Sequence, residues 1–287
     1  MFWQYLPVVM VAVAAPLAYK AKFLDLSGVV FAAVLGLIVG LSLGPLMLAV
    51  LLLFLVMNSI FTRLDYVNKA LKGAAEPKGG VRTWRSVMAN GLVAAVFATL
   101  EKIHPGTVFE IGFLGSIAVA SADTMSTEIG LLSLRKPRMI TNFRVTEPGT
   151  SGAITGLGVL GGVLGALIIS AVGLLFLHYS INIADPRHNY ALVVTTTSNI
   201  GGAGMFALIV AVGGVFGSFV DSFLGGTLQG RFVCATCGTR TERAVHCGAR
   251  ATRLSGLRFL DNDTVNVLAV AAGAAFASSL YLLLKPF

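Results

Sequence analysis

Residues 109–132 read FEIGFLGSIAVASADTMSTEIGLL, and the next twelve residues, 133–144, read SLRKPRMITNFR. The first stretch is long and apolar enough to cross a bilayer as a helix, since a span needs roughly 20 such residues. The second stretch carries the four cations Arg135, Lys136, Arg138 and Arg144. An apolar helix that ends in a basic loop is typical of a membrane protein, and it predicts that this end faces the cytoplasm.

The same alternation extends over the whole chain. Of 21 Lys and Arg residues, 18 fall in every second gap between apolar segments, at 20–22, 63–85, 135–144 and 231–258. The pattern predicts an all-α, polytopic transmembrane bundle of eight spans with both termini outside; seven is the alternative count, but it would break the alternation. The predicted spans are Trp3–Tyr19, Leu24–Gly40, Pro45–Thr62, Ser86–Leu100, Phe109–Leu132, Ile154–His178, Gly204–Leu228 and Thr264–Leu284.

Composition agrees with a membrane protein. Of the 287 residues, 56% are hydrophobic and 12% are charged, against about 25% charged in a soluble domain. We therefore expect one integral membrane domain over residues 1–287, with cytoplasmic loops at 63–85, 133–152 and 229–262. The net charge of +8 is juxtamembrane, so it indicates topology, lipid headgroups or phosphate-bearing ligands and not nucleic acid.

Glycine is abundant on the sixth predicted span. The glycines there predict close contact with another helix, since small residues let helix backbones approach each other in lipid. They are Gly156, Gly158, Gly161, Gly162 and Gly165.

Three carboxylates lie late in predicted spans, beside the basic loops: Asp123, Glu128 and Asp221. A charge in a membrane costs at least ~2.5 kcal/mol at the bilayer centre, so such residues are candidates for function. Asp123 and Asp221 together offer the hard oxygen ligands that Mg²⁺ prefers. Asp123 and Glu128 diverge by about 140° on a regular helix, so these two alone do not hold one ion. The alternatives are hydroxyl-mediated helix packing around acids that reach the interface, and an ion pair between Asp221 and an arginine.

The loop after the fifth span has the composition of a phosphate site. Its cations Lys136, Arg138 and Arg144 precede the turn Pro148-Gly149-Thr150-Ser151-Gly152, which we expect to open a helix. Free N–H groups at a helix N-terminus bind anions, and arginine binds phosphate oxygens in a bidentate manner. The alternative is a basic loop that sets topology, followed by a helix cap.

Further candidate nucleotide- or phosphate-binding residues occur where two other spans begin. Arg82, Arg85 and Asn90 stand at the start of the fourth span, and an amide within an apolar helix must find partners. Asn262 and Asn266 stand at the start of the eighth span. Asn266 would reach a ligand from one turn inside, whereas Asn262 or Asp263 would cap the helix.

All three cysteines cluster in the last basic loop. Cys234, Cys237, His246 and Cys247 form a Cys-x2-Cys-x8-His-Cys pattern, which has the ligand types of a structural zinc site. Disulfides are disfavoured in the cytoplasm, so the alternative is free thiols in a basic loop.

These groups converge on one side of the membrane. Acids for a metal, cations for phosphates and glycines for close approach are the components of phosphoryl transfer, where catalysis is mainly positioning and charge neutralisation. The donor would come from the cytosol, and a lipid-like acceptor would enter sideways from the bilayer.

Five blocks of the sequence resemble a known family, that of transmembrane protein 19 and plant phytyl-phosphate kinase, which is distantly similar to dolichol kinase and phosphatidate cytidylyltransferase. The blocks run in order to the C-terminus: Arg82-Thr-Trp-Arg-x4-Asn90-Gly91, Ala122-Asp123-Thr124-x3-Glu128-Ile-Gly130, Pro148-Gly149-Thr150-Ser151-Gly152, Asp221-Ser-x-Leu-Gly225 and Asn262-Asp-x-Val-Asn266.

The resemblance implies a magnesium-dependent kinase that moves the terminal phosphoryl of CTP onto a phytyl or polyprenyl monophosphate. By the same resemblance Asp123 and Asp221 would bind the metal, and Lys136, Arg138, Arg144 and 149–152 would bind the nucleotide phosphates. Glu128 would orient a ligand or complete the metal shell.

Two other functions stay open. One is a cytidylyltransferase that uses the same donor and releases pyrophosphate. The other is a transporter of an anionic or isoprenoid solute, which should carry polar groups in the outer half of its spans; Thr195–Thr197 and Asn199 in the outer loop are the residues that suit it.

Overall fold

The computed structural model describes residues 2–182, 200–238, 240–242 and 244–284, without the side chains of residues 2, 179–182, 200–201, 240 and 246. The helices are η1 Phe2–Gln4, α1 Leu6–Lys20, α2 Leu26–Leu43, α3 Pro45–Arg63, α4 Tyr66–Leu71, α5 Pro77–Gly80, α6 Trp84–Ile103, α7 Thr107–Gly130, α8 Gly156–Asn182, α10 Ile200–Thr227 and α11 Asn262–Leu284. The strands are β1 Arg138–Met139, β2 Ala153–Ile154, β3 Arg231–Val233, β4 Arg240–Thr241, β5 Val245–His246, β6 Ala249–Arg250 and β7 Thr252–Ser255. Thr195–Thr197 and Asn199 lie outside the described residues.

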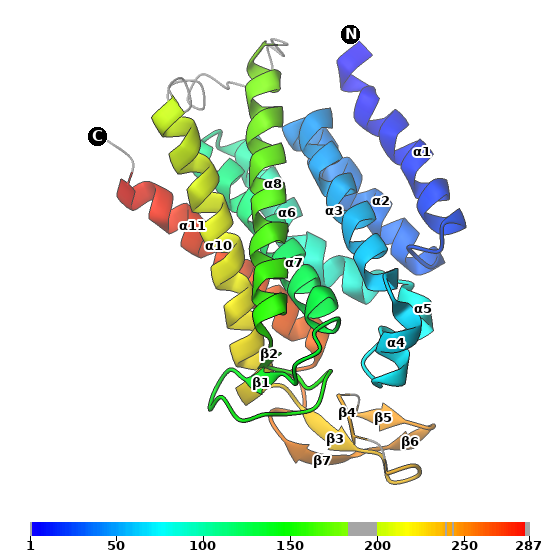
Figure 1. Ribbon diagram of the computed structural model, residues 1–287. Coiled ribbons are helices and arrows are strands. Elements are labelled where there is room, and N and C mark those ends of the chain that lie inside the picture. The colour runs from blue at the N-terminus through cyan, green and yellow to red at the C-terminus, as the bar shows by residue number, and fades with distance from the viewer. Residues whose placement is uncertain (1, 183–199, 239, 243, 285–287) are drawn as a thin grey trace.

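The long helices form one bundle, and the short elements gather at one of its ends. Figure 1 shows α4, α5 and all the strands below the bundle, while the N-terminal end of α1 points the other way. We call the lower end, which carries these short elements, the loop end, and the opposite end the far end. The three predicted loops therefore share one side of the bundle.

The predicted all-α membrane bundle is confirmed. Among the described residues, seven helices are long and apolar enough to cross a membrane: α2, α3, α6, α7, α8, α10 and α11. The short fourth predicted span is the 20-residue helix α6. The first predicted span, α1, is apolar but has 15 residues. It rises about 22 Å, which is less than the roughly 30 Å of a hydrocarbon core.

Helix α7 is the centre of the bundle. Its spanning window is 78% buried, against 33–44% for the other six, and it contacts α3, α6, α8, α10 and α11. The glycine face of α8 packs directly on its backbone: a Cβ at Gly161 would lie 2.8 Å from the Met125 carbonyl oxygen, and one at Gly165 would lie 2.9 Å from that of Ser121. The predicted glycine contact is thus formed, although Gly156 has nothing within 4 Å. Asp123 stands in the C-terminal part of α7 and so lies toward the loop end.

Three small sheets build the loop end. Strand β1 pairs with β2, β5 pairs with β6, and β3 lies between β4 and β7, all antiparallel. Arg82 also joins α6 to the α1–α2 link, because its N–H donates to the Phe23 carbonyl and its own carbonyl accepts from Asp25 N–H. Segments that are far apart in sequence therefore meet beneath the bundle.

Candidate functional site

Three helices bring carboxylates and an amide together at the loop end. Asp123 comes from α7, Asp221 from α10 and Asn266 from α11. In the amide orientation that satisfies its neighbours, Asn266 Nδ2 lies 2.9 Å from Asp221 Oδ2 and 3.1 Å from the Asn262 carbonyl oxygen. Asp123 is close enough to Asp221 to repel it electrostatically. We call Asp123, Asp221 and Asn266 the acid centre.

Charges from the loops surround the acid centre. Arg82 attracts Asp123, while Glu76 and Glu128 repel it. Glu242 repels Asp221. The sequence had singled out Arg82 and Glu128 but neither Glu76 nor Glu242, which lie in loops where a single sequence gives no periodic signal. The acid centre thus gathers carboxyl groups beside an arginine, an arrangement that suits a cation and phosphates.

Glu128 has a buried cation as its partner. Lys69 of α4 places Nζ 2.7 Å from Glu128 Oε2 and 2.8 Å from the Phe61 carbonyl oxygen. The two side chains are 1% and 5% exposed. This pair offers an alternative to the predicted metal-shell role of Glu128, which stays a prediction. Nothing in the sequence distinguishes Lys69 from the other loop lysines.

The turn Pro148–Gly152 is fixed against the end of α10. Gly152 has a φ of +78°, and a Cβ there would lie 2.3 Å from Gly226 Cα and 2.7 Å from the Ser222 carbonyl oxygen. Only glycine permits this approach, which sets the turn beside the residue that follows Asp221. Arg231 holds the contact by donating to the carbonyl of Ser151 at 2.9 Å and to that of Gly225 at 3.2 Å.

The expectation that this turn opens a helix is wrong. Strand β2 follows the turn, and α8 begins only at Gly156. Thr155 caps that helix, with its hydroxyl accepting the Gly158 N–H at 2.9 Å. The short strand forms because Arg138 and Met139 pair with Ile154 and Ala153. Phosphate binding by the turn would therefore use its own N–H groups and not those of a helix end.

The three predicted phosphate-binding cations before this turn lie on an exposed hairpin. Lys136 pairs with Glu147 at 2.8 Å, with both side chains more than 60% exposed. Arg138 donates to the Phe143 carbonyl at 2.9 Å, and the Arg144 side chain is exposed. None of the three is among the groups that act on Asp123 or Asp221. Their roles toward a nucleotide stay predictions.

Arg85 joins the starts of α6 and α11. It forms ion pairs with Asp261 and with Asp263, the latter at 3.1 Å. The cap of α11 is Asp261, whose Oδ1 accepts the Thr264 N–H at 3.0 Å, so the expected caps Asn262 and Asp263 are wrong. Burial opposes ionisation of Asp261, but the Thr264 and Arg85 contacts hold its pKa below its usual range.

An apolar groove opens between α1, α2, α3 and the start of α6. It encloses about 80 Å³ and is lined by small and aliphatic residues such as Ala14, Ala33 and Leu52. Arg82 and Asn90 also line it. The buried Asn90 donates to the Ser86 carbonyl at 2.9 Å. Arg82 is also the cation whose charge acts on Asp123, so one residue is common to the groove and to the surroundings of the acid centre.

The far end of α7 carries a carboxyl group that the sequence analysis did not single out. Glu110 is 5% exposed, and its Oε2 has no hydrogen-bond partner in the part of the chain that the structure describes. Among the described residues, Glu101 is the charged group that acts on it, and no ion pair includes it. A buried polar group therefore lies toward the far end as well, where the transporter hypothesis expects polar groups.

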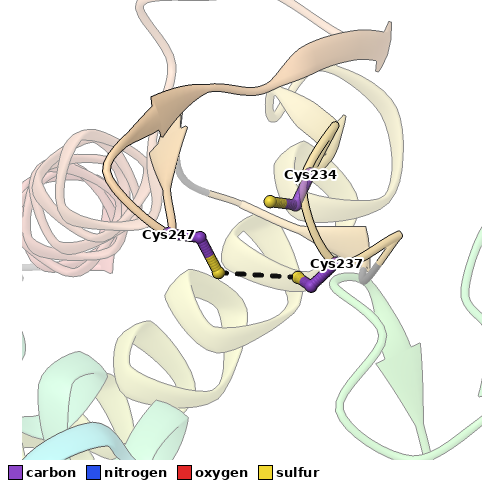
Figure 2. Close-up of side chains that lie close together, drawn as sticks. All are labelled: Cys234, Cys237 and Cys247. Carbon is purple, nitrogen blue, oxygen red and sulfur yellow. Dashed lines mark hydrogen bonds between the residues drawn. The ribbon is translucent and has the colours of Figure 1, made fainter.

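The cysteines meet in the β3–β7 region. The sulfurs of Cys234, Cys237 and Cys247 all lie within 4.8 Å of one another, and Figure 2 shows them facing a common space. The side chain of His246, the fourth predicted ligand, lies outside the described part of the chain.

Known membrane proteins are similar to this chain over most of its length. The family described as "Integral membrane protein DUF92" matches residues 9–274. An uncharacterized membrane protein of Methanocaldococcus jannaschii is 38% identical over 171 residues, which are 60% of this chain and 70% of that protein. Protein PGR of Arabidopsis thaliana is 29% identical over 267 residues, which are 88% and 87% of the two chains. Protein VTE6, chloroplastic, of the same plant is 24% identical over 259 residues, which are 88% of this chain and 64% of VTE6. No solved structure matches.

Proposed function

We propose that this chain, which belongs to the integral membrane protein family DUF92, is a lipid-phosphate kinase. Five blocks of its sequence resemble plant phytyl-phosphate kinase. The proposed kinase transfers the terminal phosphoryl of a nucleoside triphosphate, CTP by the resemblance, to a phytyl or polyprenyl monophosphate and forms the diphosphate. An oxygen of the acceptor phosphate attacks the terminal phosphorus, and the bond to the bridging oxygen of the nucleoside diphosphate breaks. Because the acceptor is already an ionised phosphate, no strong general base is needed.

The observation that carries this proposal is the meeting of Asp123 and Asp221 beside the Gly152 turn. Carboxylate oxygens together with substrate phosphates are the ligands that magnesium prefers. Asp123 and Asp221 would hold the ion, and Asn266 keeps Asp221 oriented through the 2.9 Å contact. A bound magnesium would neutralise charge on the donor phosphates. Arg82 adds a cation at the same place.

The turn and the hairpin complete the donor site in this proposal. The backbone of 149–152 binds phosphate oxygens, and Lys136, Arg138 and Arg144 bring positive charge from the exposed hairpin. Lys136 would have to leave its exposed partner Glu147, and such surface pairs contribute only about 0–1 kcal/mol. The same gathering of basic residues supports a cytoplasmic or stromal position for the loop end.

The apolar groove supports a lipid acceptor. Its aliphatic walls suit an isoprenoid chain, and Arg82 and Asn90 at its polar edge suit a phosphate. An acceptor with its chain in the groove would bring its phosphate toward Asp123, because Arg82 is common to the groove and the acid centre. On the same volume measure a water needs about 10–15 Å³, so the groove holds part of a chain and the rest would lie in the bilayer.

Transport of an anionic or isoprenoid solute is the second candidate. The observation that favours it is Glu110, a buried carboxyl at the far end of the central helix. A transporter needs polar groups along its pathway. It would, however, leave the anchored turn and Arg82 beside the acid centre without a role.

The test uses purified protein in detergent with magnesium and phytyl or geranylgeranyl monophosphate. Terminally labelled CTP, ATP, GTP and UTP are supplied in parallel, with Asp123→Asn as the inactive variant and Glu110→Gln as its matched control. Label in a lipid diphosphate, lost only in Asp123→Asn, supports the kinase and identifies the donor. CMP transfer from alpha-labelled CTP, with release of pyrophosphate, would identify a cytidylyltransferase. No transfer by folded protein overturns both and favours the transporter.

A further inference from the structure

The cysteine cluster has the dimensions of a metal–thiolate site. Cys237 Sγ lies 3.7 Å from Cys247 Sγ, far beyond the roughly 2.05 Å of a disulfide bond. In a tetrahedral zinc site with Zn–S bonds of about 2.3 Å, two sulfurs lie about 3.8 Å apart. The third sulfur, of Cys234, lies within 4.8 Å of both, so one ion could contact all three after small side-chain movements.

The backbone around the cysteines is shaped to point the thiols inward. Gly238 and Gly248, each directly after a cysteine, have φ values of +71° and +72°. Gly238 N–H also closes a turn on the Cys234 carbonyl at 2.9 Å. The backbone N–H groups of Cys237 and Thr236 face the Cys234 sulfur. Such N–H groups stabilise the thiolate form, which is the form that binds metals.

We propose that Cys234, Cys237 and Cys247 bind a structural zinc ion, and that this ion holds Glu242 against the Pro148–Gly152 turn. His246 next to Cys247 is the sequence's candidate for the fourth ligand. The strands here have two to four residues each, which is too little to bury a core of their own. Small units of this kind need a metal or another cross-link.

Glu242 connects the metal site to the turn. It stands between Cys237 and Cys247 in sequence, so it lies on the segment that the metal would close. The Ser151 hydroxyl donates a hydrogen bond to its Oε1, and Arg231 attracts it. Arg231 also donates to the Ser151 and Gly225 carbonyls. A metal that fixes this segment would therefore fix the turn beside Asp221, which matters for phosphate binding if the proposed function holds.

Zinc binding is tested without reference to activity. Full-length protein, purified in detergent without chelators, should hold about one zinc per chain. Cys237→Ser should lose it, whereas Thr236→Ser should keep it, because Thr236 meets the cluster only through its backbone. Replacement of zinc by cobalt should give the visible absorption of a tetrahedral thiolate site. The proposal would be overturned if the protein bound neither zinc nor cobalt, or if Cys237 and Cys247 formed a disulfide in a reducing, cytosol-like buffer.

The coupling to the turn is tested by proteolysis, because the 231–258 segment is rich in arginine. Chelation should raise the rate of tryptic cleavage there by roughly tenfold, with protection restored when zinc is added back. Glu242→Gln should keep the zinc but raise cleavage near the 148–152 turn. If zinc is bound but its removal leaves both cleavage rates unchanged, the coupling is refuted. Since neither readout uses substrates, failure here is distinct from failure of the kinase proposal.

Discussion

Helix α7 carries buried carboxyl groups at both of its ends, and the two ends are built differently. At the loop end, Asp123 has Arg82 nearby and Glu128 pairs with Lys69 at 2.7 Å. At the far end, Glu110 has Glu101 as its charged neighbour and no hydrogen bond to Oε2. Both ends belong to one helix with the same apolar packing, so burial alone does not distinguish them.

The difference lies in what the connecting segments provide. The loop end receives cations and polar backbone from α4, the α5–α6 link, the β1–β2 hairpin and β3, whereas among the described residues α6 and α7 meet at the far end through a link of only three residues. A charge in a membrane is retained where partners or a ligand stabilise it. The loop end is therefore organised for charged ligands.

The largest expected effect separates the two ends by activity. Asp123→Asn should reduce label transfer by about a hundredfold to a thousandfold, as does the loss of other groups that stabilise transition-state charge. Glu110→Gln keeps size and polarity and should change the rate less than about twofold, since no ion pair among the described residues includes Glu110. Equal losses in the two variants would break the comparison and give the far end a part in function.

The buried ion pair should show the next largest effect, on stability. Lys69→Met leaves Glu128 buried without its cation and should lower the free energy of unfolding by about 3–5 kcal/mol. The double variant Lys69→Met with Glu128→Met should recover most of this loss. Thermal unfolding in detergent measures both.

Glu110→Met is the matched control at the far end. No ion pair among the described residues includes Glu110, so Glu110→Met should lower the free energy of unfolding by less than Lys69→Met does. If the double variant is no more stable than Lys69→Met, the two residues do not act as a pair.

Filling the apolar groove should change the KM for the lipid monophosphate about tenfold. Ala14→Trp fills the groove and should raise the KM for the lipid monophosphate by about tenfold, with kcat nearly unchanged, because only acceptor binding is lost. Ala12 lies two residues away and faces outward, so Ala12→Trp is the matched control and should leave KM unchanged. A fall in kcat with unchanged KM would place the acceptor elsewhere.

Much of this architecture follows from the sequence, because charge alternation and apolar length act along the chain. They predicted the bundle, the shared side of Asp123, Asp221 and Asn266, and the glycine face, and the sequence blocks identified the family, which the comparisons confirm. The Lys69–Glu128 pair joins residues 59 positions apart. Contacts of this kind depend on how the short helices fold back, and no local pattern encodes that.

The same limit explains the errors. The turn at 148–152 has the composition of a helix start, but pairing of Arg138 with Ile154 delays the helix to Gly156. Asn262 has a capping side chain, but Asp261 precedes it and takes that position. In both cases a tertiary or neighbouring contact competed with a local preference and determined the boundary.

The smallest expected effect concerns Glu242, the loop-end carboxyl outside the spans. Burial raises its pKa, while the Ser151 hydrogen bond and Arg231 oppose that shift; Asp221 and Glu76 face the same region. A carboxyl with a raised pKa binds its proton more tightly in the folded state than in the unfolded state. Its contribution to stability is therefore present at low pH and is lost as the pH rises through the folded-state pKa.

The expected result is a stability that declines with pH above the ordinary range of glutamate, and a shallower decline in Glu242→Gln. Melting temperatures measured across mildly acidic to neutral pH, with zinc present throughout, test this directly. Glu147→Gln is the matched control, because Glu147 is 75% exposed on the hairpin and should not alter the slope. If Glu242→Gln and Glu147→Gln give the same slope of melting temperature against pH, ionisation of Glu242 beside Ser151 does not lower the stability. The loop end would then stabilise negative charge even without a bound metal, which would sharpen its contrast with the far end.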